Sequence, residues 1–223
     1  MKQKLVLASI LFPMMLLAQT NDAQLWENIY IETDITQKFY AHFNHEGRIT
    51  NNISQFNYGY GDIGLSYKLF KKDHLSLDYV FVIKNYENGK VSYRHQYYAA
   101  NTFKKKINPF TLYWRIMYQV EYDDVNSTEN GKNGDYYIRN KLTIKWKTPG
   151  RYIPYIASEL YYNADNDRKF GQQFDRLRTY AGCFYELNKI DMLEAYYLLE
   201  KHFQVNDPAT NWVIGLGYDH LFY

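Results

Sequence analysis

The sequence predicts an all-β protein, an antiparallel up-and-down transmembrane β-barrel of about ten strands, and three observations support this prediction. Apolar and polar side chains alternate through most of the chain that follows residue 18. The alternating segments are about twice as long as the roughly five or six residues that are typical of strands in soluble proteins. The connections between them alternate between short and long, as do the periplasmic turns and external loops of outer-membrane barrels.

The composition fits a barrel that meets lipid on one face only. Tyr, Phe and Trp make up 19% of the 223 residues, yet the mean hydropathy of −0.55 is that of a soluble protein. In a transmembrane barrel only every second strand residue meets lipid, and aromatic girdles lie at both interfaces. The net charge of +2 gives no general basic surface, so nucleic acid is not expected as a partner.

Residues 1–18 have the layout of a secretory signal peptide. Lys2 and Lys4 precede an apolar run over 5–17 that is too short to span a bilayer. Cleavage is expected after Ala18, and residues 19–223 then form one outer-membrane barrel domain. Cys183 is the only cysteine in the sequence, so no disulfide can form within the chain.

Each predicted strand carries one apolar face and is bounded by turn-forming residues. Between residues 73 and 84, for example, Leu75, Leu77 and Phe81 alternate with polar side chains or valine. The ten predicted strands are 37–46, 58–70, 73–84, 90–104, 109–122, 135–147, 151–163, 172–187, 190–203 and 209–222. With the C terminus in the periplasm, the short turns are periplasmic and the connections 46–57, 85–89, 123–134, 163–171 and 204–208 are external.

Residues 24–33 do not fit this arrangement of ten strands, because they look like one more strand and would make the number odd. Single-chain bacterial barrels are expected to have an even number of strands. The segment therefore extends the first strand, folds into the lumen, or belongs to a barrel of about twelve strands in which 49–56 is another strand.

The face opposite the apolar one points into the lumen and carries charges of both signs. A guanidinium group can bind a carboxylate on a neighbouring strand while its stem packs on tyrosine. The predicted charged layer of a largely plugged lumen consists of Arg94, Arg115, Glu121, Arg139, Lys141, Glu159, Arg176, Arg178, Glu186 and Glu194. Lys68, Asp78 and Glu200 share this inward parity. Paired charges that form a structural core are favoured here over charges that line a polar path or a ligand pocket.

Glycines in the strands are predicted to have a structural role. Gly215 and Gly217 face inward in the last strand, where they let the barrel bend or a luminal side chain lie flat.

The sequence contains no recognisable catalytic or metal-binding motif. The six histidines are scattered without a metal-ligand spacing, and no G-x-S-x-G motif occurs. Ser92 and His202 are both predicted to face the lumen near its external end, so they are the one pair to consider as nucleophile and base. We expect no catalytic residue, no metal and no cofactor, and no enzyme activity.

Several short segments together resemble a known family. They are Leu25-Trp26, Glu46-Gly47-Arg48, Gly64-Leu65-Ser66-Tyr67, Arg94, Arg139 with Lys141, Arg176 with Arg178, and the aromatic last strand over 215–223. With these residues the chain resembles the uncharacterised outer-membrane barrel family called domain of unknown function 2490, over nearly the whole mature chain. The resemblance implies a barrel in the outer membrane of a Gram-negative bacterium, and it implies no activity, ligand or catalytic residue.

The expected function is that of a structural barrel or a narrow channel. The alternatives are a lipid-modifying outer-membrane hydrolase and a surface adhesion barrel that acts through the loop 123–134. The expected partners are outer-membrane lipid and, during biogenesis, the barrel-assembly machinery, and the expected oligomeric state is a monomer.

Overall fold

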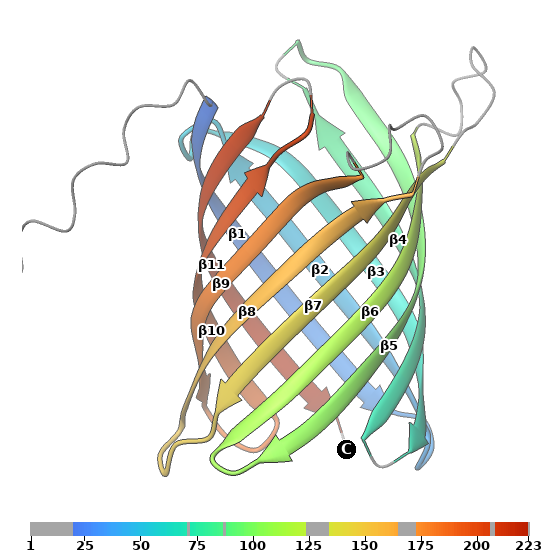
Figure 1. Ribbon diagram of the computed structural model, residues 1–223, viewed down its shortest axis with the longest axis vertical. Coiled ribbons are helices and arrows are strands. Elements are labelled where there is room, and N and C mark those ends of the chain that lie inside the picture. The colour runs from blue at the N-terminus through green and yellow to red at the C-terminus, as the bar shows by residue number, and fades with distance from the viewer. Residues whose placement is uncertain are drawn as a thin grey trace, which may run out of the picture.

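The computed structural model describes residues 20–70, 72–86, 88–123, 134–164, 173–205 and 208–222. In these residues eleven tilted strands form one closed barrel (Figure 1). The strands are β1 (Thr20–Asp34), β2 (Phe39–Thr50), β3 (Gln55–Phe70), β4 (Asp73–Asn85), β5 (Val91–Ile107), β6 (Phe110–Asp123), β7 (Asp135–Trp146), β8 (Tyr152–Asn163), β9 (Phe174–Glu186), β10 (Asp191–His202) and β11 (Ala209–Phe222). The predicted signal peptide and nearly all of the loop 123–134 lie outside the described residues.

The predicted all-β closed barrel is confirmed, but the count of about ten strands, or alternatively twelve, is not exact, and one strand pair is parallel. Residues 24–33 belong to β1, which pairs antiparallel with β2 and parallel with β11. In an up-and-down barrel with an odd number of strands, the first and last strands run in the same direction, so their pairing is parallel. The even number follows only when every pair is antiparallel. Residues 49–56 are not a further strand, because 51–54 form the turn between β2 and β3.

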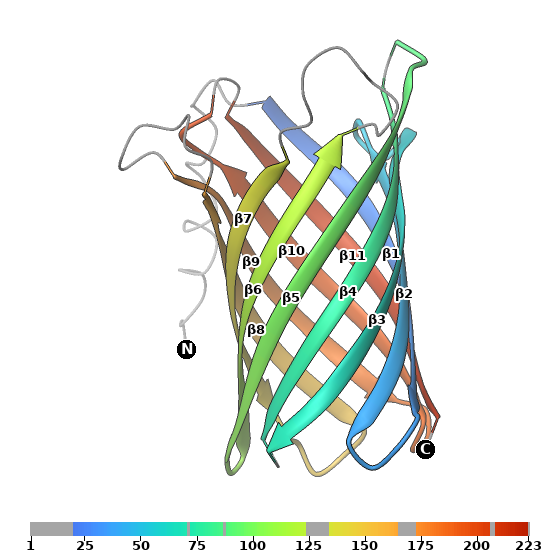
Figure 2. The same ribbon diagram turned by 90° about the vertical axis from the view of Figure 1, so that its right-hand side faces the viewer.

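The two ends of the barrel differ. The connections 35–38, 108–109, 147–151 and 187–190 are at one end, which we call the turn end, and residue 72 between β3 and β4 and the C-terminal end of β11 lie there too (Figures 1 and 2). The opposite end, the loop end, carries the other connections and the start of β1. Because β1 and β11 both run from the loop end to the turn end, they can pair along their whole length.

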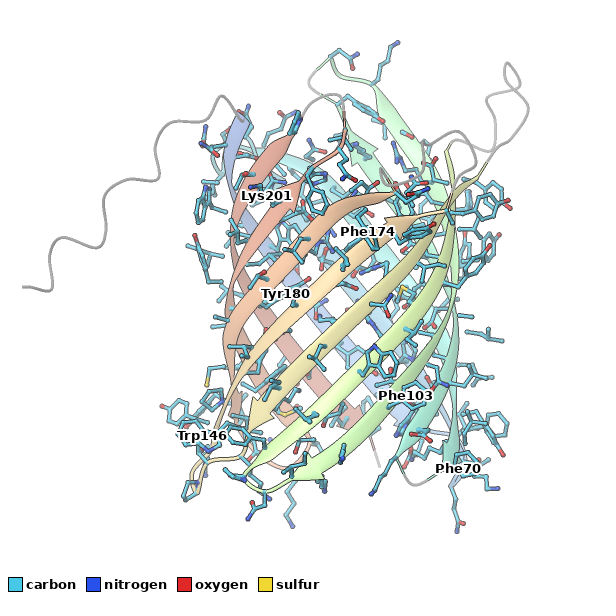
Figure 3. The ribbon with its side chains drawn as sticks, viewed as in Figure 1. Phe70, Phe103, Trp146, Phe174, Tyr180 and Lys201 are labelled. Atoms are coloured by element: carbon cyan, nitrogen blue, oxygen red, sulfur yellow. The ribbon has the colours of Figure 1, made fainter. Side chains whose placement is uncertain are left out.

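Apolar side chains cover the outside of the barrel, as predicted. Ile63, Leu77 and Leu216 are 58%, 64% and 54% exposed, whereas the inward Val82 and Val213 are fully buried. Figure 3 shows Phe70 and Trp146 near the turn end and Phe174 near the loop end, and all three rings are exposed. A continuous apolar exterior with aromatic side chains toward its ends is typical of a surface that faces lipid. Among the described residues, no helix is long and apolar enough to cross a membrane.

Gly215 lets the ring of Tyr196 lie flat against the luminal side of β11, which confirms the predicted role of this glycine. The two residues are direct partners in the β10–β11 pair. A Cβ atom on Gly215 would lie 2.0 Å from the Tyr196 ring, so no larger residue fits unless the ring moves. The inner wall is therefore packed closely at the strand that closes the barrel.

Cysteine cross-linking tests the parallel pairing of β1 with β11. In a Cys183→Ala background, the pair Leu25→Cys and Ile214→Cys is expected to form a disulfide on oxidation, because these residues are direct partners on the outer face. The pair Leu25→Cys and Tyr218→Cys is expected to stay reduced, since its partners are roughly 13 Å apart along the strand. Non-reducing electrophoresis of the boiled protein separates the two results. Cross-linking of the second pair, or of neither, would contradict the parallel pair.

The substitution Gly215→Ala is expected to lower the free energy of unfolding by roughly 1 to 3 kcal/mol, because the new methyl group overlaps the Tyr196 ring. Gly61→Ala is the control, since the nearest atom to its Cβ would be a Phe43 ring carbon 3.7 Å away. Urea titration of both variants measures the difference. Equal unfolding midpoints for the two variants would show that the close approach at Gly215 does not matter for stability.

Candidate functional site

The lumen contains a cavity of about 920 Å³ that side chains from all eleven strands line. The lining is polar because each strand turns its non-apolar face inward. Charges of both signs contribute to it, the cations being Arg48, Lys84, Arg94, Arg115, Arg139, Lys141, Lys145, Arg176 and Arg178, and the carboxylates Asp22, Glu46, Asp62, Glu121, Glu159, Glu194 and Glu200.

Glu159 on β8 is almost completely buried, with 1% of its side chain exposed. Its Oε1 accepts hydrogen bonds from Arg115 Nη2 at 2.9 Å and from Arg139 Nη2 and Nε at 2.8 and 3.1 Å. Arg115 lies on β6 and Arg139 on β7, so one carboxylate joins three neighbouring strands. Charge-assisted bonds of this kind are the stronger hydrogen bonds in proteins.

A second buried ion pair joins the strands at the other side of β8. Arg178 on β9 donates from Nε to Glu200 Oε2 on β10 at 2.5 Å, and both side chains are more than nine-tenths buried. Glu200 Oε1 also accepts a hydrogen bond from Asn211 Nδ2 on β11 at 2.9 Å. The guanidinium charge is thus balanced within the wall of the lumen.

A third pair lies on β5 and β6. Arg94 Nη1 donates to Glu121 Oε1 at 2.6 Å, and Gln96 Nε2 donates to Glu121 Oε2 at 2.7 Å. Arg48 and Glu46 make the corresponding pair along β2, with Nη2 2.5 Å from Oε1. Each of these four carboxylates therefore has an arginine partner.

Aromatic rings connect these arginines across the lumen. The Arg48 guanidinium lies 3.9 Å from the ring centre of Trp26 on β1 and 4.3 Å from that of Tyr58 on β3. The Arg178 guanidinium on β9 lies 5.1 Å from the ring centre of the same Trp26 and 5.1 Å from that of Tyr161 on β8. Cation–π contacts in desolvated positions contribute about 2 kcal/mol each.

Hydrogen bonds complete the circle on the opposite wall. Arg139 lies 4.5 Å from the Tyr161 ring and donates from Nη1 to Gln119 Oε1 at 2.9 Å. Gln119 Nε2 donates to Gln96 Oε1 at 3.3 Å, and Gln96 Nε2 donates to the Tyr58 hydroxyl at 3.5 Å. We call this closed set of contacts the luminal girdle, which comprises Trp26, Arg48, Tyr58, Gln96, Gln119, Arg139, Tyr161 and Arg178.

The structure brings most of the predicted charged layer together. Nine of its members line the cavity, namely Arg94, Arg115, Glu121, Arg139, Lys141, Glu159, Arg176, Arg178 and Glu194. Glu186 is outside that lining, because it is the last residue of β9 at the turn end. Glu194 accepts a hydrogen bond from the Tyr155 hydroxyl at 2.5 Å, while Arg178 takes Glu200 as its partner.

The sequence interpretation missed the part of the girdle that β1 and β2 supply. Arg48 fell into the predicted external connection 46–57, and Trp26 fell into the segment that was not assigned to the barrel. The parity of β1 carried a signal, since Trp26 alternates in phase with Gln24 and Asn28 and not with the apolar Leu25 and Ile29.

Ser92 and His202, the candidate nucleophile and base, lie on opposite sides of the barrel. Ser92 is on β5 and His202 on β10, with four strands between them along the shorter way round. His202 Nε2 instead lies 3.0 Å from Glu200 Oε1. The structure does not bring these two residues together.

One group of potential metal ligands occurs in the described part of the chain. It consists of His42 on β2, Asp62 on β3 and Asp78 on β4, whose ligand atoms lie within 4.8 Å of one another. The sequence interpretation predicted no metal site, because these residues are far apart along the chain and only the strand register unites them.

Comparison with known proteins gives a family match and two similar folds. The profile of the family described as "Protein of unknown function (DUF2490)" matches residues 23–213. The β domain of the Bordetella autotransporter BrkA has 9% sequence identity and a TM-score of 0.48, over 83% of this chain and 84% of that chain. The siderophore receptor PirA from Pseudomonas aeruginosa has 14% identity and a TM-score of 0.36, over 80% of this chain and 34% of that one. None of the curated proteins matches the chain.

The substitution Glu159→Gln is expected to lower the free energy of unfolding by roughly 3 kcal/mol, because it leaves the partly buried guanidinium groups of Arg115 and Arg139 without their shared carboxylate. Glu27→Gln is the control, since the Glu27 side chain is 51% exposed and its contact with His45 contributes less than about 1 kcal/mol. Urea unfolding in the same detergent measures both. A Glu159→Gln barrel as stable as the control would mean that the pairing does not hold the strands together.

Proposed function

We propose that this chain, which belongs to the family described as Protein of unknown function (DUF2490), is an outer-membrane β-barrel of a Gram-negative bacterium. Its charge-paired lumen acts as a structural core and leaves only a narrow polar path. The barrel on this proposal is not a wide pore and not an enzyme.

The surface of the barrel supports the membrane assignment. Apolar side chains are exposed around the outside, and the charges are gathered in the lumen. In water this arrangement would expose a large apolar surface to solvent, whereas in a bilayer the outer side chains contact lipid. Because the barrel is closed, every strand is also paired on both edges, as a membrane-spanning sheet requires.

The luminal girdle is the observation that carries the proposal of a narrow path. The contact between Trp26 on β1 and Arg178 on β9 passes over β10 and β11, so these side chains extend into the lumen. Leu198 and Val213, from the two strands that are passed over, are fully buried. The side chains of this side of the barrel therefore fill the space inside the wall.

The remaining cations of the lumen are held by aromatic rings. Lys145 Nζ lies 3.8 Å from the ring centre of Phe184, and Lys141 Nζ lies 4.3 Å from that of Tyr180. Contact with a ring holds each ammonium group against the wall of the lumen. The proposed lumen therefore has its cations fixed by carboxylates or by rings, as in a structural core.

Planar-bilayer recording tests the proposal. The wild-type barrel is expected to show only small, rare openings, because the girdle leaves no wide path. Arg178→Ala removes the side chain that reaches both Trp26 and Tyr161, so it is expected to increase the conductance severalfold. Arg151→Ala, in an exposed turn, is the matched control and is expected to behave like the wild type. A large, stable and ion-selective conductance of the wild-type protein would overturn the proposal.

A further inference from the structure

We propose that His42, Asp62 and Asp78 bind one divalent transition-metal ion inside the lumen. The three residues face inward from adjacent strands β2, β3 and β4. His42 Nε2 lies 2.6 Å from Asp78 Oδ1, and the ligand atoms of all three residues lie within 4.8 Å of one another. This spacing is close enough for one ion to reach an atom of each residue after small side-chain movements.

Several polar atoms of this site lack a protein hydrogen bond. Asp78 Oδ1 has His42 Nε2 as its partner at 2.6 Å, but among the described residues Asp78 Oδ2, Asp62 Oδ1 and His42 Nδ1 have no hydrogen-bond partner. The Asp78 side chain is fully buried, and that of His42 is 10% exposed. Buried polar atoms are nearly always satisfied in native proteins, so buried carboxylate oxygens without a hydrogen-bond donor, close to an imidazole nitrogen, are suited to binding a cation.

The surroundings hold the three side chains in place. The Tyr98 hydroxyl donates to Asp62 Oδ2 at 2.5 Å, which leaves Oδ1 of the same carboxylate for an ion. A Cβ atom on Gly64 would lie 1.9 Å from Asp78 Oδ1 and 2.4 Å from the His42 ring. Only glycine at this position leaves room for the ligands to meet, and outer partners such as Tyr98 orient ligands in known metal sites.

Charge favours a divalent ion over the alternatives. Two carboxylates this close repel each other in a confined space of low dielectric constant. A protonated His42 would balance one of the two negative charges, whereas a divalent ion balances both. One imidazole nitrogen with carboxylate oxygens is a donor set for Zn²⁺, Mn²⁺ or Fe²⁺, and three protein ligands leave a position for water.

The site can be reached from the cavity. Asp62 belongs to the lining of the 920 Å³ cavity, so an ion in solution gains access along the lumen. His42 and Asp78 lie toward the turn-end termini of β2 and β4, which places the site in the turn-end half of the barrel. A bound ion would link the three strands β2, β3 and β4.

Calorimetric titration of the chelator-treated, folded barrel with Zn²⁺ tests the site. The wild type is expected to bind one Zn²⁺ per chain with a dissociation constant in the micromolar range or below, and its melting temperature is expected to rise by several degrees. His42→Ala and Asp78→Asn are expected to lower the affinity at least about tenfold. His45→Ala is the matched control, because this histidine lies on the same strand and faces outward, and it is expected to bind like the wild type.

The folding of each variant is checked by its heat-modifiable migration in electrophoresis. The absorption spectrum of the wild type with Co²⁺ is a second measurement that needs no variant. At one Co²⁺ per chain we expect an intense visible band, which is typical of Co²⁺ with a low coordination number. Three results would each overturn the proposal. These are no binding by the wild type, binding by folded His42→Ala or Asp78→Asn that equals the wild type, and a Co²⁺ spectrum identical to that of the ion in water.

Discussion

The indole of Trp26 is in contact with the guanidinium groups of Arg48 and Arg178, which lie 3.9 and 5.1 Å from its ring centre. This stack connects β1 with its neighbour β2 and, past β11 and β10, with β9, so it holds β1 in the wall where it pairs with β11. A ring that is 2% exposed in a polar lumen contributes its apolar burial as well as its contact with two cations. The Trp26 side chain therefore contributes both to the closure of the barrel at β1 and to the packing of the luminal arginines.

The carboxylates of the lumen are explained by the burial of these arginines. An arginine that reaches an aromatic ring inside the barrel leaves bulk water, and a buried cation is destabilising unless a carboxylate accompanies it. Arg178 has Glu200, Arg48 has Glu46, and Arg139 shares Glu159 with Arg115. Each pair joins or reinforces neighbouring strands, so the polar interior takes the place of the apolar core that a soluble protein of this size would have.

Alternation along the chain predicted the outward faces and most of the charged layer, because the period of two fixes the face of each residue without knowledge of its neighbours. Leu77 and Trp114 are outside and Glu159 is inside, as their parity requires. The sequence left β1 unassigned because the expected even number of strands excluded it, and a parallel closing pair removes that restriction. The girdle and the His42 group needed the register between strands, and alternation within one strand contains no information about register.

The most direct test of this account is a double-mutant cycle on Trp26 and Arg178, measured as free energies of unfolding in lipid vesicles. If the stack helps to hold the closed barrel together, Trp26→Leu and Arg178→Gln should show a coupling energy of about 1 to 2 kcal/mol. The cycle separates the Trp26–Arg178 contact from the loss of the Glu200 partner, because that loss occurs in both variants that lack Arg178. Additive effects within about 0.5 kcal/mol would contradict the account, since they would mean that the strands close without this interaction.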